Sequence, residues 1–384
     1  MRKATIRTLP FTDTNRTLIP FPALDKDPEN QLRSLREQID AIDSELLGLM
    51  NRRLDVAKAV AAVKSTLDEP AFYRPEREAQ VLRRLHDLND GPLTDSGLES
   101  LFREIMSITR GSEAGLSVSI LGPLGTYTEA AARQHFGSAV EIVDFPTIDE
   151  IFKSTETGNT HFSVVPVENS TEGGVTGTLD RMVSTTLTIC GEINLKIHHN
   201  FMSNESDLKD ISKVYAHVQS LGQCKRWLEK HLPGVERVPV GSNADAARKA
   251  AGESGTGAIA GDAAAERYGI SILNHSIEDE PGNTTRFLVL SDRKTPPSGC
   301  DKTSVLLSAK SEPGALLHLL QPLLDEKIDM SKIESRPSRV GLWEYVFFID
   351  FLGHSEEPHI ARAMKKLEQE ASLFKHLGSY PVSV

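Results

Sequence analysis

The stretch "LSVSILGPLGTYTEAAARQHF", residues 116–136, passes from an apolar run through a Gly-Pro and Gly turn into an alanine-rich segment. The apolar run is typical of a buried strand, and the segment after the turn is typical of a helix. Short β-branched runs alternate with helical patterns from there to residue 290. This alternation predicts an α/β domain in the middle of the chain.

Composition places the whole chain among ordinary globular proteins. Its 384 residues suggest two to three domains, and 39% are hydrophobic and 25% charged. No apolar run approaches the ~20 residues that span a membrane. A formal net charge of −11 argues against a general nucleic-acid binder. Cys190, Cys224 and Cys300 lie far apart without C-x-x-C spacing, so we expect no disulfide framework, no zinc site and a reducing cytoplasm.

The regions on either side of the α/β stretch have different patterns. Residues 1–28 are proline-rich and aperiodic, which predicts a disordered tail without a secretory signal. Residues 30–69 have the pattern of one long helix, and shorter helical patterns follow at 77–87 and 96–108. After a turn-rich linker at 291–302, the pattern alternates as βαββαβ, a ferredoxin-like order.

The first helix has an apolar stripe interrupted by cations. The stripe consists of Leu32, Leu35, Ile39, Ile42, Leu46 and Leu49. At about 100° per residue, Arg53 falls within this stripe and Lys64 beside it. Burying an unpaired charge costs several kcal/mol, so both cations need an anionic partner. That partner is either a ligand or, alternatively, a glutamate such as Glu78 or Glu104, unless the cations reach the edge of the stripe.

Arg36 lies beside the same stripe but far from Arg53. The 17 intervening residue steps correspond to roughly 25 Å of helix. One small ligand cannot contact both side chains of the same helix. If Arg36 binds the same kind of ligand, it completes a site in a partner chain, and a helix this long also needs a partner to cover its stripe. We therefore expect an intertwined homodimer.

The helical region resembles a known enzyme family. "LREQIDAIDSELLGLMNRRLDVAKAVAAVK", "YRPEREAQVL" and "LFREIMS" resemble the all-helical chorismate mutases. The resemblance implies that Arg36 of one subunit and Arg53 of the other bind the two substrate carboxylates. It also implies that Lys64 and Glu113 contact the ether oxygen as catalytic groups. The reaction, a Claisen rearrangement to prephenate, needs only a preorganised cationic site, without metal or cofactor.

Further mutase residues follow from the "ERE" element. Arg77 and Glu78 match it, and the resemblance implies that Glu78 contacts the substrate hydroxyl. Relatives often have Asp where this chain has Arg74, so an alternative is a degenerate mutase domain. Glu113 replaces the more common Gln, which predicts that a protonated Glu113 is needed and that activity improves at lower pH.

In the middle domain, polar residues cluster where apolar strands end. The stretches "VVPVENSTEGGV" (164–175), "VYAHVQSLGQCKRWL" (214–228) and "GNTTRFLVL" (282–290) share this pattern. Such strand ends form ligand crevices in α/β sheets. The helix that starts near Thr126 or Thr128 offers N–H groups to an anion. Phosphate-loop and dinucleotide motifs are missing, which disfavours nucleotide binding.

These stretches together resemble the prephenate dehydratases over residues 116–291. The family implies a two-lobed domain related to type II periplasmic binding proteins, with prephenate between the lobes. The implied substrate-binding residues are Thr126, Asn169, Ser170, Gln223, Thr285, Arg286 and Phe287. Thr285 is the expected catalytic donor to the departing hydroxyl, and Arg286 the expected carboxylate ligand. The glycines that follow Ser170 are expected to let the backbone approach the substrate.

Other side chains of this domain have competing interpretations. His217 is a rival proton donor, because its ordinary pKa suits acid catalysis better than that of a threonine. The adjacent pair His198 and His199 cannot easily converge on a metal. Cys224 is expected to pack in the core.

The C-terminal module resembles an ACT domain of the variety attached to prephenate dehydratases. Its "GAL" and "ESRP" elements imply phenylalanine binding by Gly314, Ala315, Leu316, Glu334, Ser335, Arg336 and Pro337. Ligand at an interface between two such domains could bias an equilibrium between subunit arrangements. The alternative is a plain dimerising domain.

The sequence thus predicts a multidomain enzyme of the bifunctional chorismate mutase–prephenate dehydratase family, inhibited by phenylalanine. The expected division is a tail at 1–28, an all-α mutase domain at 29–114, an α/β dehydratase domain at 116–292 and an α+β ACT domain at 302–381. We expect a cytoplasmic homodimer or larger homo-oligomer without metal, cofactor, nucleic acid or membrane partner. The alternatives are a dehydratase with an inactive mutase domain and a non-catalytic amino-acid or solute-binding protein.

Overall fold

The computed structural model describes residues 27–66, 73–111, 115–309, 312–337 and 345–383. Most of the predicted tail, residues 1–26, lies outside them. Contacts divide the chain into two units, Met1–Val63 and Lys64–Val384. Among the described helices, none combines the length and apolar character needed to cross a membrane.

The helical region begins with α1 (Pro28–Thr66), one continuous helix of 39 residues. Along its predicted apolar stripe, Leu35 is 37% exposed and Ile39 57%. The following helices are α2 (Pro75–Leu88) and α3 (Asp95–Gly111). They bury apolar residues of their own, including Leu82 and Met106. The three predicted helices are therefore present.

The first lobe of the α/β region is a mixed sheet in the order β2-β1-β3-β11-β5, with the short β4 paired to β3. Its strands are β1 (Ser117–Leu121), β2 (Glu141–Phe145), β3 (Phe162–Asn169), β4 (Gly173–Gly174), β5 (Thr188–Lys196) and β11 (Thr284–Ser291). The helices beside them are α4 (Tyr127–Phe136), α5 (Ile148–Glu156) and α6 (Thr176–Ser184). Strands β1, β2 and β3 run parallel, whereas β11 is antiparallel to β3 and β5. The polar carboxyl end of β3 therefore meets the amino end of β11.

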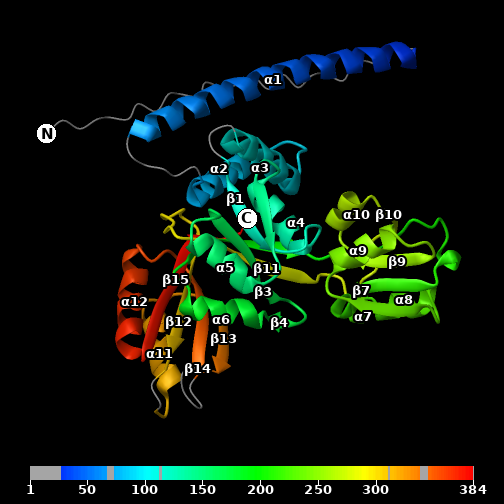
Figure 1. Cartoon of the computed structure of the whole chain (residues 1–384). Coiled ribbons are helices and arrows are strands. Elements are labelled where there is room, and N and C mark those ends of the chain that lie inside the picture. The colour runs from blue at the N-terminus through cyan, green and yellow to red at the C-terminus, as the bar shows by residue number, and fades with distance from the viewer. Residues whose placement is uncertain (1–26, 67–72, 112–114, 310–311, 338–344, 384) are drawn as a thin grey trace. The chain divides into compact units, whose positions relative to one another are not determined.

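The second lobe is a separate sheet in the order β10-β6-β9-β7-β8 (Figure 1). Its strands are β6 (Asn200–Ser203), β7 (Lys213–His217), β8 (Glu236–Val240), β9 (Thr256–Ala260) and β10 (Ser271–Asn274). Its helices are α7 (Val218–Gln223), α8 (Lys225–His231), α9 (Asn243–Ala251) and α10 (Asp262–Tyr268), with a short 3₁₀ turn at Leu208–Asp210. The lobe is inserted between β5 and β11, so the chain passes between the lobes twice. The predicted two-lobed α/β architecture is confirmed.

The C-terminal region is an antiparallel sheet in the order β13-β14-β12-β15 with two helices (Figure 1). Its elements are β12 (Asp301–Ser308), α11 (Ala315–Asp325), β13 (Met330–Pro337), β14 (Tyr345–Leu352), α12 (Pro358–Glu370) and β15 (Leu373–Pro381). This is the predicted βαββαβ order. One sheet face packs on α11 and α12 through residues such as Leu319 and Leu367. On the other face, Leu306, Phe348 and Tyr380 share a core with Leu288 of the first lobe.

Candidate active sites

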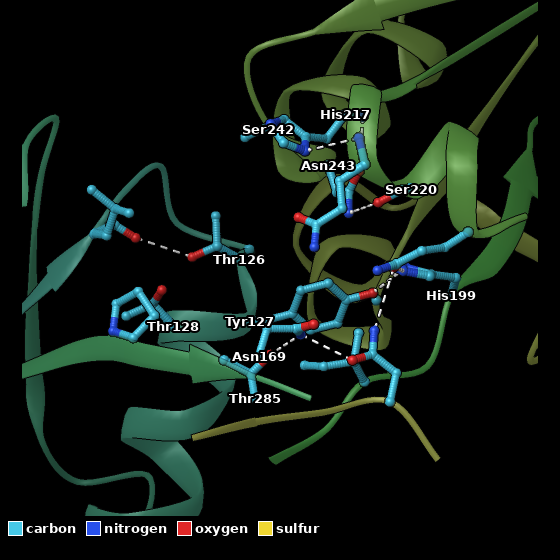
Figure 2. Close-up of a pocket in the computed structure, with 18 of the residues that line it drawn as sticks. Thr126, Tyr127, Thr128, Asn169, His199, His217, Ser220, Ser242, Asn243 and Thr285 are labelled. Carbon is cyan, nitrogen blue, oxygen red and sulfur yellow. Dashed lines mark hydrogen bonds between the residues drawn. The ribbon is translucent and has the colours of Figure 1, made fainter. Parts of the chain in front are cut away.

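A cavity of about 250 Å³ lies between the two lobes of the α/β region. Its lining includes Leu121, Gly122, Gly125, Thr126, Tyr127, Thr128, Pro166, Asn169, Asn283, Thr285 and Phe287 near the first sheet, and His199, His217, Gln219, Ser220, Gln223, Gly241, Ser242, Asn243 and Gly261 near the second. Figure 2 shows Thr126, Asn169 and Thr285 on one side of it and His217, Ser220 and Asn243 on the other. The ends of β3, β7 and β11 thus converge on one site, as the sequence predicted.

Asn169, at the end of β3, is held against Thr285 at the start of β11 (Figure 2). Its Nδ2 donates to Thr285 Oγ1 at 2.8 Å and to Asn283 Oδ1 at 2.9 Å. Its Oδ1 accepts the backbone N–H groups of Thr171 and Glu172 at 3.0 and 3.2 Å. Because those two groups can only donate, they fix the orientation of the amide. Thr285 Oγ1 therefore accepts from Asn169 and keeps its own proton available to a group in the cleft.

A second polar chain runs across the cleft through Tyr127, His199 and Gln223. His199 Nε2 lies 2.7 Å from Gln223 Oε1, and its Nδ1 lies 2.8 Å from the Tyr127 hydroxyl. Burial lowers the pKa of His199, which favours the neutral ring. Since an amide oxygen only accepts, the proton of the neutral ring lies on Nε2. The Tyr127 hydroxyl proton is shared between His199 Nδ1 and the His198 carbonyl oxygen, which lies 2.7 Å from the hydroxyl. Gln223 also donates to Thr171 Oγ1 at 3.2 Å, which joins this chain to the loop that orients Asn169.

Of the predicted dehydratase residues, Thr126, Asn169, Gln223, Thr285 and Phe287 line the cleft. Ser170 lies next to it, where its hydroxyl accepts the Thr284 backbone N–H at 3.0 Å. It thereby ties the β3 loop to β11 rather than lining the cavity.

The structure corrects the expectation for Arg286. Its guanidinium donates to Glu192 at 2.9 Å, to Asp350 at 2.6 Å and to the Tyr380 hydroxyl at 2.9 Å. Burial works to lower the pKa of Arg286, but these three neighbours raise it overall. The reason for the misplacement is the pleat: successive side chains of a strand point to opposite faces, and Thr285 already occupies the cleft face. Arg286 therefore contacts the C-terminal domain instead of a ligand in the cleft.

The expectation for the glycines after Ser170 also needs correction. A Cβ atom built on Gly174 would collide with the Glu334 carboxylate of β13. Gly173 has a φ of +81° and open space around it. The close approach at Gly174 is thus made to the C-terminal sheet, and Gly173 serves the turn.

No Lys or Arg is among the described residues that line the cleft. Positive potential comes instead from two helix N-termini, one from each lobe. Thr126 is the N-cap of α4, and Ser242 caps α9 by accepting the Asp245 N–H at 3.0 Å. N-terminal N–H groups favour anions. The sequence indicated the first of these helices but missed the second.

The remaining polar candidates of this domain fall into different places. His217 lines the cleft as the N-cap of α7, where its Nδ1 accepts from the Gln219 N–H at 3.4 Å. His198 points to Glu278 instead, at 2.9 Å. Cys224 is fully buried, and burial raises the pKa of its thiol, as expected for a packing residue. The described residues contain no cluster of three or more His, Cys, Asp or Glu suited to a metal.

Three of the predicted mutase residues lie on α1. Arg36 is exposed on α1, and Arg53 and Lys64 are partly buried on the same helix. Glu113 lies outside the described residues. Burial lowers the pKa of Arg53, which is the expected direction for a cation removed from water.

On α2, Arg77 is exposed, whereas Glu78 forms an ion pair with the buried Arg110 of α3. Arg110 also donates to the Phe136 carbonyl at 2.5 Å. Contact between Glu78 and a substrate hydroxyl would have to compete with this pair. Sequence reasoning missed Arg110, although its position in the third helical segment, beyond the apolar pattern, marks it as a charged residue near a core.

In the C-terminal domain, Gly314 is the left-handed N-cap of α11, with a φ of +79°, and Ala315 and Leu316 follow it in the helix. Glu334, Ser335, Arg336 and Pro337 form the end of β13. Ser335 is exposed, while Glu334 and Arg336 are partly buried. The two predicted phenylalanine-binding elements are therefore a left-handed glycine cap and an edge strand.

Sequence comparison identifies the class of protein. The chain matches family models for chorismate mutase type II at residues 35–114, for prephenate dehydratase at 118–295 and for the ACT domain at 303–369. These matches define a multidomain enzyme with both activities and a regulatory domain.

The relatives narrow this class further. A bifunctional chorismate mutase/prephenate dehydratase from Pseudomonas aeruginosa is 50% identical over 93% of this chain and 99% of its own length. The chain belongs to the bifunctional chorismate mutase/prephenate dehydratase family. It converts chorismate to prephenate and prephenate to phenylpyruvate.

Two solved structures share the fold of the dehydratase and C-terminal regions. Prephenate dehydratase from Arthrobacter aurescens in complex with L-Phe has a TM-score of 0.64 and 32% identity, covering 69% of this chain and 90% of that one. GqqA, described as a novel type of quorum quenching acylase, also has a TM-score of 0.64, with 27% identity over 70% of this chain and 98% of that one. The fold alone thus accommodates proteins described by different activities, and the full-length relatives carry the assignment.

Proposed function

We propose that Thr285 is the group that assists departure of the ring hydroxyl of prephenate. The observation that carries this proposal is the fixed amide of Asn169, which donates to Thr285 Oγ1 and leaves the threonine proton for the substrate. Loss of CO₂ sends an electron pair into the ring, the C–O bond breaks, and the departing hydroxide takes a proton from solvent and leaves as water. A threonine stabilises this oxygen by a hydrogen bond rather than as a strong acid.

The substrate carboxylates are taken by neutral donors. Because Arg286 faces away, the N-termini of α4 and α9 supply the positive potential, with Thr126 and Asn243 beside them. Asn169, Gln223 and Phe287 complete the proposed substrate contacts, and Ser170 supports the loop. Hydroxyl and amide donors on both lobes suit a ligand that the lobes enclose.

For the mutase reaction we assign Arg36 and Arg53 to the two carboxylates of chorismate. Lys64 and Glu113 are assigned to the ether oxygen, and Arg77 and Glu78 to the remaining polar contacts. The exposed stripe of α1 supports a homodimer in which Arg36 reaches the partner's site, since a stripe of this size needs a cover.

In the C-terminal domain we assign phenylalanine to the surface formed by Gly314, Ala315, Leu316 and residues 334–337. The complex of the Arthrobacter aurescens relative with L-Phe supports this choice of ligand. Phenylalanine is one transamination beyond phenylpyruvate in chemistry, so its binding gives feedback inhibition. We keep 29–114, 116–292 and 302–381 as the boundaries of the three domains, and the free thiols of Cys190, Cys224 and Cys300 fit the cytoplasm.

Two substitutions at one position test the dehydratase assignment. Thr285→Val keeps the shape but loses the hydroxyl, and Thr285→Ser keeps the hydroxyl. We expect the valine variant to lose about 10²- to 10³-fold in kcat for prephenate and the serine variant to stay within about tenfold. His217→Gln tests the rival donor. A valine variant with wild-type kcat, or a histidine variant with the larger loss, contradicts the assignment.

A further inference from the structure

Two neighbouring cross-strand pairs connect β3 and β11, and they face in opposite directions. Thr285 is paired with Asn169 in register, and Arg286 with Glu168. The first pair lines the cleft, as its hydrogen bond of 2.8 Å shows. The second pair points to the C-terminal sheet, because side chains alternate along a strand. Residues one position away from the catalytic pair are therefore bound by another domain.

Both members of the outward pair are held by that domain. Glu168 accepts from Lys332 of β13 at 2.7 Å. Arg286 donates to Asp350 of β14 at 2.6 Å and to the Tyr380 hydroxyl of β15 at 2.9 Å. The side-chain exposures are 13% for Arg286, 9% for Asp350 and 14% for Lys332, whereas Glu168 is 37% exposed. The ion pair of Arg286 with Asp350 is therefore screened little by salt, and that of Glu168 with Lys332 is screened more.

The network extends around Arg286. Glu192 of β5 accepts from Arg286 at 2.9 Å and from Lys302 of β12 at 2.8 and 2.9 Å. Asp350 in turn accepts from Ser304 Oγ at 2.5 Å. The guanidinium is thus enclosed by acceptors fixed in two sheets. A shift of the C-terminal sheet cannot occur without moving Arg286 or breaking these bonds.

The strand that holds Glu168 also carries predicted phenylalanine-binding residues. Lys332, Glu334 and Arg336 alternate along β13 and share its partly buried face. Glu334 lies against Gly174, and Arg336 Nε lies 4.0 Å from Asp180. β13 therefore contacts the end of β3, the turn after Asn169 and α6.

We propose that Arg286 and Glu168 are positioning residues, through which the C-terminal sheet sets the placement of Thr285 and Asn169. The proposal rests on the role of Thr285 proposed above. A displacement of β13 or β14 moves the outward pair, and the adjoining inward pair moves with it on the same strands. Misplacement of about 1 Å can cost as much as 10²-fold in rate, so a small shift suffices for control.

The first arm of the test separates positioning from binding. Arg286→Met should lower kcat for prephenate about tenfold while KM stays within about twofold, and Arg286→Lys should recover part of the loss. A cooperative thermal unfolding transition like that of the wild type reports that the domain carrying Arg286 is folded. An increase in KM at unchanged kcat would mean that Arg286 binds substrate directly, and would overturn the proposal. If Arg286→Met does not fold, Asp350→Asn keeps the shape of the site and should also lower kcat.

The second arm tests transmission with a matched control. Lys332→Met should raise the phenylalanine concentration for half-inhibition about fivefold or more, while calorimetry still detects phenylalanine binding within about twofold of wild type. Lys375→Met is the control, because Lys375 also contacts the dehydratase domain, at the carbonyls of Met182 and Thr185, but not on β3 or β11. It should leave kcat and inhibition unchanged.

The outcomes distinguish this proposal from the function on which it rests. The proposal is overturned if kcat and inhibition by phenylalanine are as unchanged in Lys332→Met and Arg286→Met as in Lys375→Met, while Thr285→Val is inactive. A fully active Thr285→Val would instead remove the proposed role of Thr285 itself.

Discussion

The dehydratase cleft and the mutase residues differ in how much of a site one chain provides. In the cleft, β3, β7 and β11 bring Asn169, His217 and Thr285 to one cavity. The assigned cations of the mutase are instead spread along α1, whose apolar stripe stays open, with Leu46 45% exposed. A folded lobe pair can organise a site within itself, whereas a single helix cannot enclose a ligand.

The two activities therefore depend on different levels of structure. The dehydratase site follows from sheet topology within the chain. The mutase site follows from association, if a second copy supplies Arg36. Substitutions should therefore separate the two activities. Dilution, or a substitution in the interface between two copies, should lower the mutase activity alone.

The largest expected effect is a separation of the two activities. Arg53→Ala should lower mutase activity by about 10³-fold or more and spare the dehydratase, because Arg53 is the proposed ligand of a chorismate carboxylate and is not assigned to prephenate in the cleft. Thr285→Val should do the reverse. Each variant is assayed with chorismate and with prephenate. If a folded variant loses both activities, the two sites are not separate.

Mixing inactive variants tests whether the mutase site is shared. Subunits with Arg36→Ala and subunits with Arg53→Ala should each be inactive as homodimers. After dissociation and random reassociation, half of the dimers are mixed and one of their two sites is intact, so about a quarter of wild-type mutase activity should return. No recovery in mixed dimers verified by differential tagging would place both arginines in one chain's site.

A charge in the apolar stripe of α1 should lower mutase activity because it disfavours the dimer. Leu46→Glu places a carboxylate on the apolar face of α1 and should lower mutase activity about tenfold at micromolar concentration, with a shift toward monomer in sedimentation. Dehydratase activity should stay within about twofold. Ser44→Glu, on the opposite face of the helix, is the matched control. Equal effects of both substitutions would contradict a dimer through this stripe.

The smallest expected effect is an acid sensitivity confined to the unit that holds the cleft. Burial, with Lys294 and His354 nearby, lowers the pKa of His376 to about 4. Its unfolded value is about 6.5, so the unfolded chain takes up the proton first as pH falls below 6.5. Stability contributed by the neutral ring is complete above that pH and decreases by about 1.4 kcal/mol at pH 5.5.

Denaturant unfolding at pH 7.5 and 5.5 measures this change, with His376→Gln as the comparison. Between these pH values, the free energy of unfolding of His376→Gln should fall by about 1.4 kcal/mol less than that of the wild type. Residues 27–66 contain no histidine, so the helix α1 should not share this response. If the free energy of unfolding falls equally between pH 7.5 and pH 5.5 in both proteins, His376 is not the source of the loss.

Much of the fold was predictable because periodicity records which faces are buried. The alternation from residue 116 onward predicted the two-lobed region, and the spacing of Leu32 to Leu49 predicted α1. Tyr127 and His199 were not assigned to the cleft, since neither belongs to a motif and only the approach of the two lobes joins them. Asn283 lay within the quoted "GNTTRF" stretch but could not be distinguished from its neighbours there.

Arg286 marks the limit of sequence reasoning most clearly. "TRF" identifies a dehydratase strand, but adjacent residues of a strand face opposite sides, and the letters do not say which side faces the ligand. Only the packing of β12, β14 and β15 against the first lobe shows that Arg286 belongs to an ion-pair network with Asp350 and Glu192.

Local periodicity and short motifs in the sequence predicted the three kinds of domain and their order. The tertiary structure alone decided which motif residues share a cavity and which reach another domain. Side-chain direction depends on register and on long-range packing, and a linear sequence contains neither explicitly.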